Sequence, residues 1–122
     1  MKGSNFISRK DLKNIDCVLH LASIANDPAA ELNTKLTWDV NVLATYKLIT
    51  FAVDQKVKKF IFASSGSVYG IKKEKKVTEN LSLEPVSEYN KSKMIGERVL
   101  LSYKKKIDIT ILRPATVCGY SP

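Results

Sequence analysis

Three short apolar segments dominate the hydrophobic pattern of the chain. Residues 16–22, 59–65 and 107–112 are rich in Val, Leu, Ile and Phe, and polar or turn-forming residues bound each of them. Short apolar runs of this kind are typical of strands that are buried on both faces of a parallel sheet. The pattern therefore predicts three buried β-strands.

The longer segments between these strands carry helical patterns. From residue 38 to about residue 55, apolar residues recur every three or four positions, which predicts a helix with one buried face. A second helix is expected to begin after Ser87, its N-cap, and to run to about residue 105. The polar segments 23–33 and 71–86 are expected to be loops. Alternating strands and helices predict an α/β fold with right-handed crossovers.

The carboxyl ends of the predicted strands are where a ligand is expected. In open parallel sheets, ligands bind in the crevice outside these ends. Residues 21–23, 63–65 and 114–116 follow the three strands and should therefore converge on one crevice.

The net charge of +8 raises the question of a nucleic-acid partner. However, the dense basic runs at 56–59, 72–76 and 104–106 are lysines in predicted loops or at element ends, without interleaved aromatic residues. We expect these lysines to be solvated surface, with no nucleic-acid partner.

The remaining composition predicts a cytoplasmic protein without a metal site. Its two cysteines form no secreted disulfide framework, and Cys17 and His20 should point to opposite faces of a strand, which excludes a shared metal. No apolar run is long enough for a signal peptide or a membrane span, so no membrane partner is expected.

The most suggestive chemical pair is Tyr89 and Lys93, which lie four residues apart near the start of a predicted helix and so share one face. A nearby cation can lower the pKa of a phenol until it works as a base. The spacing alone is weak evidence, because Tyr69 and Lys73 share it in a predicted loop. Context favours Tyr89, since Ser65 ends the preceding strand and could hold the same substrate oxygen.

The serine cluster at this strand end has two interpretations. Ser64, Ser65 and Ser67 could face a ligand, or they could form a turn whose hydroxyls satisfy backbone groups. Without other motifs the two interpretations are about equally supported.

Together, five ordered segments resemble the extended short-chain dehydrogenase/reductase family, specifically its NAD-dependent sugar-nucleotide epimerase/dehydratase branch. They are 16–22 (DCVLHLA), 41–45 (NVLAT), 62–70 (FASSGSVYG), 89–93 (YNKSK) and 112–119 (LRPATVCG). The resemblance implies that residues 1–122 form a partial Rossmann-like NAD-binding domain. Its strands would be equivalent to the family's fourth, fifth and sixth strands, with their crossover helices.

The resemblance also implies residue roles. Tyr89 would remove a proton from a sugar hydroxyl held by Ser65 while the sugar carbon gives a hydride to NAD. Lys93 would bind the nicotinamide ribose and lower the pKa of Tyr89. Residues implied to line the cofactor are Leu21, Ala22, Ser23, Asn41, Ser64, Tyr89, Lys93 and Pro114. A nucleotide-sugar substrate would contact Ser65, Tyr89 and Thr116, and the parent protein is expected to be a homodimer.

Two departures from the family limit what the resemblance implies. The chain has no glycine-rich phosphate-binding turn and no substrate domain, so we expect a fragment, or one piece of a split protein, that alone binds NAD weakly or not at all. Ser67 stands where the family's dehydratases usually carry an acid, which favours an epimerase or keto-sugar reductase. The alternative is a non-catalytic scaffold of the same fold whose basic surface binds RNA or acidic partners.

Overall fold

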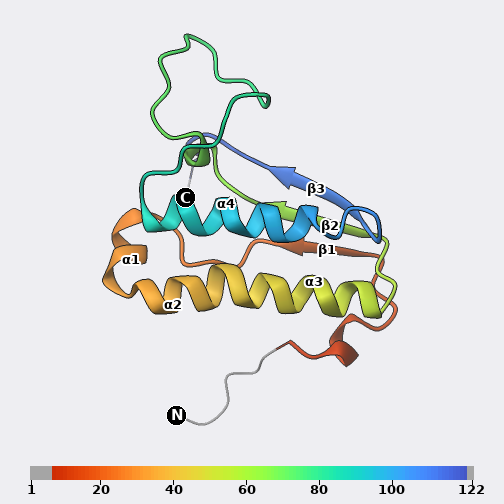
Figure 1. Cartoon of the computed structure of the whole chain (residues 1–122). Coiled ribbons are helices and arrows are strands. Elements are labelled where there is room, and N and C mark those ends of the chain that lie inside the picture. Colours follow the sequence, from red (N-terminus) through yellow and green to blue (C-terminus); the bar gives the residue numbers. More distant parts are fainter. Residues whose placement is uncertain (1–6, 121–122) are drawn as a thin grey trace.

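A parallel three-stranded sheet is the centre of the computed structural model, which describes residues 7–120 (Figure 1). The strands are β1 (Cys17–His20), β2 (Lys59–Ala63) and β3 (Asp108–Leu112), in the order β1-β2-β3. Their register aligns Val18 with Phe60 and Phe60 with Ile109. The predicted α/β fold with a parallel sheet is confirmed, although residues 1–6 and 121–122 of the predicted domain lie outside the described part.

The first crossover is more helical than the sequence pattern predicts. It contains α1 (Asp27–Leu32), α2 (Thr34–Trp38), the π-helical segment η2 (Asp39–Leu43) and α3 (Ala44–Asp54). Backbone angles stay helical from α2 through η2 into α3. The helix predicted from residue 38 to about residue 55 is therefore confirmed, and helical structure begins earlier, at Thr34. The predicted loop 23–33 is wrong in its second half, because Asn26 caps α1 by accepting a hydrogen bond from the Ala29 amide at 3.0 Å.

The second crossover follows the prediction closely. A 3-10 turn, η3 (Gly66–Tyr69), follows β2, and the long loop after it has no helix or strand between residues 71 and 86. The helix α4 (Glu88–Leu101) begins after its predicted N-cap, Ser87, and ends a few residues earlier than expected. Within residues 7–120, no helix is long and apolar enough to cross a lipid bilayer.

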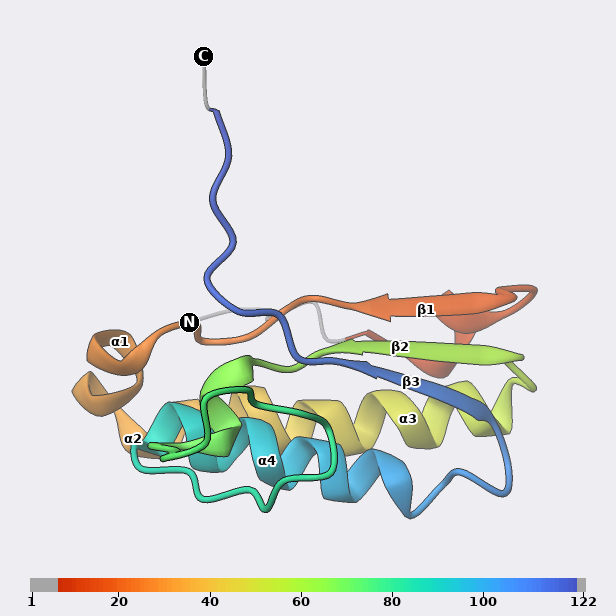
Figure 2. The same ribbon diagram turned by 90° about the horizontal axis from the view of Figure 1, so that it is seen from above.

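The core lies between the sheet and the helices α3 and α4 (Figure 2). Phe60 and Phe62 of β2 point into it and are almost fully buried, together with Ile49 of α3 and Leu100 of α4. A Cβ atom at Gly96 would lie 3.2 Å from the Phe62 ring, so glycine here allows α4 to approach the sheet closely.

The expectation that the strands are buried on both faces is wrong for the described chain. Buried and exposed residues alternate along β1, and Leu19 is 56% exposed. The reason is that α3 and α4 cover the same face of the sheet, leaving the other face open (Figure 2). β1 is also an edge strand of this sheet, so the backbone groups along one of its sides have no strand partner among the described residues.

Candidate active site

The start of α4 places Tyr89 and Lys93 one turn apart on the helix. The Ser87 hydroxyl oxygen accepts a hydrogen bond from the Asn90 amide at 3.2 Å, which fixes the first turn. The Lys93 ammonium nitrogen lies 5.8 Å from the centre of the Tyr89 ring. The structure therefore brings the predicted tyrosine and lysine together.

Ser65 meets this pair from the end of β2. It is the N-cap of η3, where its hydroxyl oxygen accepts a hydrogen bond from the Ser67 amide at 3.2 Å. The same hydroxyl is close enough to the Tyr89 phenol to act on its ionisation, and hydrogen bonding by Ser65 lowers the pKa of that phenol. The turn interpretation of the serine cluster is confirmed for Ser65, which caps η3, and contact of these serines with a ligand stays a prediction.

Lys93 is a buried amine at the carboxyl end of β2. Its ammonium group donates a hydrogen bond to the Ala63 carbonyl at 2.9 Å and lies 5.0 Å from the centre of the Phe62 ring. The side chain is 2% exposed, and burial lowers the pKa of Lys93 to about 8. One of its three donor positions is used by Ala63, which leaves the others for a ligand.

The phenol of Tyr89 is held in its protonated form. Burial, the larger cause, and the negative charge of Asp27 raise its pKa, and a hydrogen bond that the Ser65 hydroxyl can donate to the phenolate opposes them. As described, the chain therefore holds Tyr89 as an acid, and a further positive charge is needed to make it a base near neutral pH.

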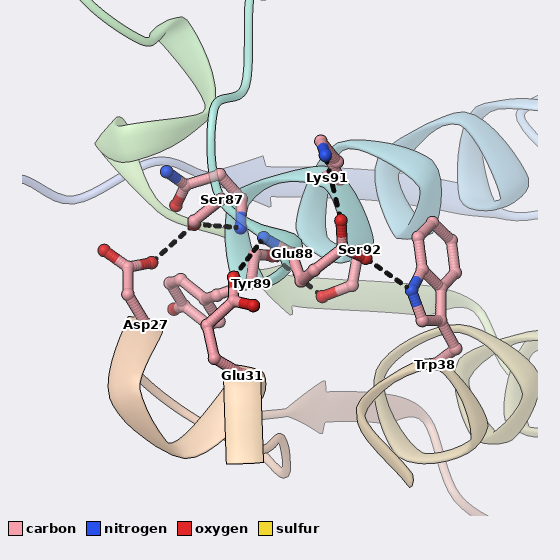
Figure 3. Close-up of polar contacts among 9 residues, drawn as sticks. Asp27, Glu31, Trp38, Ser87, Glu88, Tyr89, Lys91 and Ser92 are labelled. Atoms are coloured by element: carbon pink, nitrogen blue, oxygen red, sulfur yellow. Dashed lines mark hydrogen bonds and ion pairs between the residues drawn. The ribbon is translucent and has the colours of Figure 1, made fainter. Parts of the chain in front are cut away.

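Asp27 and Glu31 of α1 bind the N-terminus of α4 (Figure 3). The Ser87 hydroxyl donates to an Asp27 oxygen at 2.5 Å, and the Glu88 amide donates to Glu31 at 3.3 Å. Carboxylates are favourable at a helix N-terminus because unpaired amides and the helix dipole are positive there. The sequence analysis did not place Asp27 and Glu31 beside Tyr89, because it predicted a loop there. Asn26 and Pro28 are nevertheless a signal for the start of a helix.

A second contact ties the middle of the first crossover to the same turn. The Trp38 indole donates a hydrogen bond to Glu88 at 2.9 Å, and Lys91 forms an ion pair with Glu88 at the same distance (Figure 3). The hydrogen bonds from Lys91 and Trp38 lower the pKa of Glu88. Glu88 therefore stays ionised and links the two crossover segments.

Behind Ser65, a buried ion pair joins the ends of two strands to α4. Arg113 binds Glu97 through two nitrogens at 2.7 and 2.9 Å and donates to the Tyr69 hydroxyl at 2.8 Å. Glu97 also accepts from Ser64 at 2.5 Å and is 1% exposed. Tyr69 and Lys73 have the same four-residue spacing as the candidate pair Tyr89 and Lys93. In the structure, Tyr69 is instead a hydrogen-bond partner of Arg113.

Four of the residues implied to line the cofactor lie in or beside the segment that follows β1. Leu21, Ala22 and Ser23 follow β1, at the expected edge of the sheet. Asn41 is 2% exposed, and its amide binds both backbone groups of Ile24 and the Ser92 hydroxyl. Asn41 therefore holds the segment after β1 in place, and its direct contact with a cofactor stays a prediction.

The segment after β3 lies beside the turn that follows Ser65 and lines a cavity with it. The Gly66 amide donates to the Pro114 carbonyl at 2.8 Å, which joins this segment to the turn after Ser65. A cavity of about 940 Å³ is lined by Ser65, Ser67, Pro114 and Thr116 among others. Among residues 7–120, no group of three or more His, Cys, Asp or Glu side chains could hold a metal ion.

Comparison with known proteins finds a matching family model and similar curated proteins. The model of the NAD dependent epimerase/dehydratase family matches residues 5–122. The UDP-glucose 4-epimerase of Lactobacillus helveticus is 32% identical over 120 residues, covering 95% of this chain and 36% of that protein.

Solved structures agree with these sequence relatives. The UDP-N-acetylglucosamine 4-epimerase of Methanobrevibacter ruminantium M1, in complex with UDP-N-acetylmuramic acid, is similar with a TM-score of 0.83 at 32% identity, covering 86% of this chain and 34% of that one. A dTDP-glucose 4,6-dehydratase of Streptomyces venezuelae with NAD bound has a TM-score of 0.82 at 28% identity, covering 86% and 33% of the two chains. These similarities confirm the partial Rossmann-like fold, and the chain spans about a third of the length of the relatives it matches.

Proposed function

Because this chain belongs to the NAD dependent epimerase/dehydratase family, we propose that it carries the chemical half of a sugar-nucleotide oxidoreductase site, with Ser65, Tyr89 and Lys93 as its catalytic residues. The observation that carries the proposal is their convergence at the carboxyl end of β2, where Lys93 binds Ala63 and Ser65 contacts Tyr89. In open α/β sheets, this edge is the place where ligands bind.

The residues present fit a nicotinamide cofactor on one side of the site. Lys93 offers ammonium donors beside an open strand end, as binding of a ribose hydroxyl requires. Leu21, Ala22, Ser23, Ser64 and Pro114 would line the rest, and Asn41 would support them from behind. When bound, NAD takes a hydride from the sugar carbon, and its oxidised ring supplies a positive charge.

Tyr89 would take the proton of the sugar hydroxyl, and Ser65 would hold that hydroxyl in place. Bringing a phenol from its ordinary pKa near 10 to neutrality requires about 4 kcal/mol of differential stabilisation. Burial and Asp27 raise the pKa of Tyr89 further, so the requirement grows in this chain. A protonated Lys93 and the charge of the oxidised cofactor are the groups that would supply it.

Ser67 favours epimerisation or keto-sugar reduction over water elimination. It occupies the position two residues after Ser65, and its hydroxyl donates a hydrogen bond to the Asn90 side-chain oxygen at 2.5 Å. A hydroxyl with an ordinary high pKa is a poor proton donor for elimination. The substrate class proposed is a nucleotide sugar, as in the relatives described above, bound by a homodimeric parent protein.

A chimera tests the proposed catalytic residues, because the chain spans only part of its relatives. We would replace the matching segment of the Lactobacillus helveticus UDP-glucose 4-epimerase with residues 7–120 of this chain. The chimera should retain NAD and interconvert epimers. Tyr89→Phe should lose nearly all turnover yet keep NAD, because it removes the proton acceptor and leaves Lys93 in place.

Tyr103→Phe is the matched control, since Tyr103 follows the end of α4 that is far from Tyr89, and its hydroxyl contacts Thr50. Full turnover in Tyr89→Phe by an NAD-loaded chimera would overturn the proposal. The scaffold alternative predicts instead that the 122-residue chain binds RNA with a steep salt dependence, and that Tyr89→Phe does not change it.

A further inference from the structure

A row of three polar side chains leads from the candidate site to α4. The Ser65 and Ser67 hydroxyl oxygens are 2.7 Å apart, and the Ser67 hydroxyl donates to the Asn90 side-chain oxygen at 2.5 Å. Asn90 follows Tyr89 directly in α4, and its own amide is fixed by Ser87 at 3.2 Å. The row therefore starts beside the phenol and ends on a rigid helical turn.

The number of hydroxyl protons determines which group in this row donates each hydrogen bond. The carbonyl oxygen of Asn90 only accepts hydrogen bonds, so the single proton of Ser67 points toward it. The oxygen of Ser67 is then the acceptor in its contact with Ser65, and the Ser65 proton points toward Ser67. Ser65 also accepts the Ser67 amide at 3.2 Å, so one lone pair remains for Tyr89.

We propose that Ser67 and Asn90 are positioning residues that turn the Ser65 hydroxyl proton away from Tyr89, so that Ser65 accepts a hydrogen bond in the resting site. The inference rests on the proposed function, in which Ser65 and Tyr89 share one substrate oxygen. Neither Ser67 nor Asn90 needs to touch the substrate for this role.

This orientation suits one stage of the proposed reaction and opposes another. An acceptor at Ser65 receives the hydrogen of a sugar hydroxyl, whereas a keto-sugar oxygen requires a donor. To donate, Ser65 must release Ser67 and rotate its proton toward the substrate. The strength of the contact between Ser65 and Ser67 therefore sets the balance between the two states of Ser65.

The ionisation of Tyr89 reports this orientation without cofactor or substrate. The charged groups facing Tyr89 are Asp27 of α1 and Lys93 of α4, and neither is changed by substitutions at Ser67. In Ser67→Ala, the Ser65 proton loses its acceptor and becomes free to bind the Tyr89 phenolate. A hydrogen bond to the charged form lowers a pKa, so Tyr89 should titrate at lower pH than in the unchanged chain.

The experiment is an NMR titration of the 122-residue chain with 13C at the tyrosine ζ position, assigned with Tyr89→Phe. Ser67→Ala should shift the Tyr89 midpoint downward, and Ser67→Thr, which keeps the hydroxyl, should restore it. Ser65→Ala combined with Ser67→Ala should titrate like Ser65→Ala alone. Asn90→Ala acts at the other end of the row and should also lower the midpoint, because it releases the Ser67 proton.

Ser102→Ala, at the far end of α4, is the matched control and should leave the midpoint unchanged. An unchanged or raised midpoint in Ser67→Ala or Asn90→Ala, with the fold intact in the same spectra, overturns the inference. The titration contains no NAD or sugar, so its failure leaves the proposed function standing. Loss of the proposed function in the chimera would likewise leave the orientation of Ser65 intact.

Discussion

His20 shows how one buried residue couples the fold to pH. Its Nε2 atom is 2.8 Å from the Thr45 hydroxyl, which itself donates to the Asn41 carbonyl at 2.8 Å. Thr45 must therefore accept from His20, so the neutral imidazole carries its proton on Nε2. Burial first, and the charge of Lys93 second, lower the pKa of His20 to about 4.

This shift predicts acid destabilisation with a defined window. As the pH falls from 6.5 toward 4, the unfolded chain gains a proton at His20 and the folded chain does not. Protonation of His20 should lower the free energy of unfolding by about 3 kcal/mol across this window, and His20 should contribute no further loss below it. Urea unfolding at a series of pH values would measure the loss.

In His20→Gln, which keeps a side-chain donor for Thr45, the pH dependence in this window should largely disappear. An equal loss of stability in that variant would show that other groups cause it.

Much of the site was predictable at the residue scale because its chemistry depends on spacing. Tyr89 and Lys93 lie one turn apart on α4. Ser65 lies near them because α4, the crossover helix after β2, begins at the same edge of the sheet at which β2 ends. The contact between Ser67 and Asn90 was not predictable, because it joins two elements that are far apart in the sequence. The raised pKa of Tyr89 was also not predictable, since it comes first from burial and then from Asp27, which lies in a segment predicted to be a loop.

At the scale of elements, the turn after η3 depends on a single backbone conformation. Gly70 has a φ of 70°, and a Cβ atom there would lie 2.0 Å from the Glu84 carbonyl oxygen. Across this loop, Lys72 pairs with Glu84 at 2.7 Å. Gly70 thus allows the two ends of the lysine-rich loop to meet.

Gly70→Ala should therefore destabilise the chain by about 2 kcal/mol or more, because the side chain demands both a strained φ and a shift of the Glu84 backbone. Thermal and urea unfolding would measure the change. Gly119→Ala is the matched control, since a Cβ atom there meets nothing within 4 Å. Equal stability of Gly70→Ala and the unchanged chain would contradict the described turn.

Strong local signals explain which elements the pattern predicted. The apolar periodicity of α3 and the N-cap at Ser87 were sufficient for the two long helices. The short helix α1 has only six residues and one buried side chain, Ala30, so periodicity could not indicate it. Its signal was the cap at Asn26 followed by Pro28, which the loop interpretation set aside.

For the whole molecule, the open face of the sheet is an exposed apolar region that the topology creates. Leu19 of β1 and Leu112 of β3 alternate with residues that face the helices, and they are 56% and 48% exposed. In the register of the sheet, Leu19 pairs with Ile61 of β2, and Ile61 pairs with Thr110 of β3, two residues before Leu112. Apolar surface of this kind favours association with other apolar surfaces.

The isolated chain should therefore bind the dye ANS and self-associate as its concentration rises, measured by fluorescence and by sedimentation. Leu19→Lys should reduce both effects, because it places a charge on the open face without touching the core. Leu32→Lys is the matched control, since Leu32 is 87% exposed on α1, away from the sheet. An equal effect of the two substitutions would show that the sheet face is not responsible.

The strand order β1-β2-β3 repeats the order of the strands along the chain. Each strand therefore pairs only with the strand made just before or just after it, and none has to insert between two others. As the chain leaves the ribosome, β1, α3 and β2 can assemble before β3 has been synthesised, and β3 with α4 then adds to the free side of β2. Tyr89 and Lys93 arrive with this second unit, so the side chains proposed to be catalytic are placed only after the surface that receives them has formed.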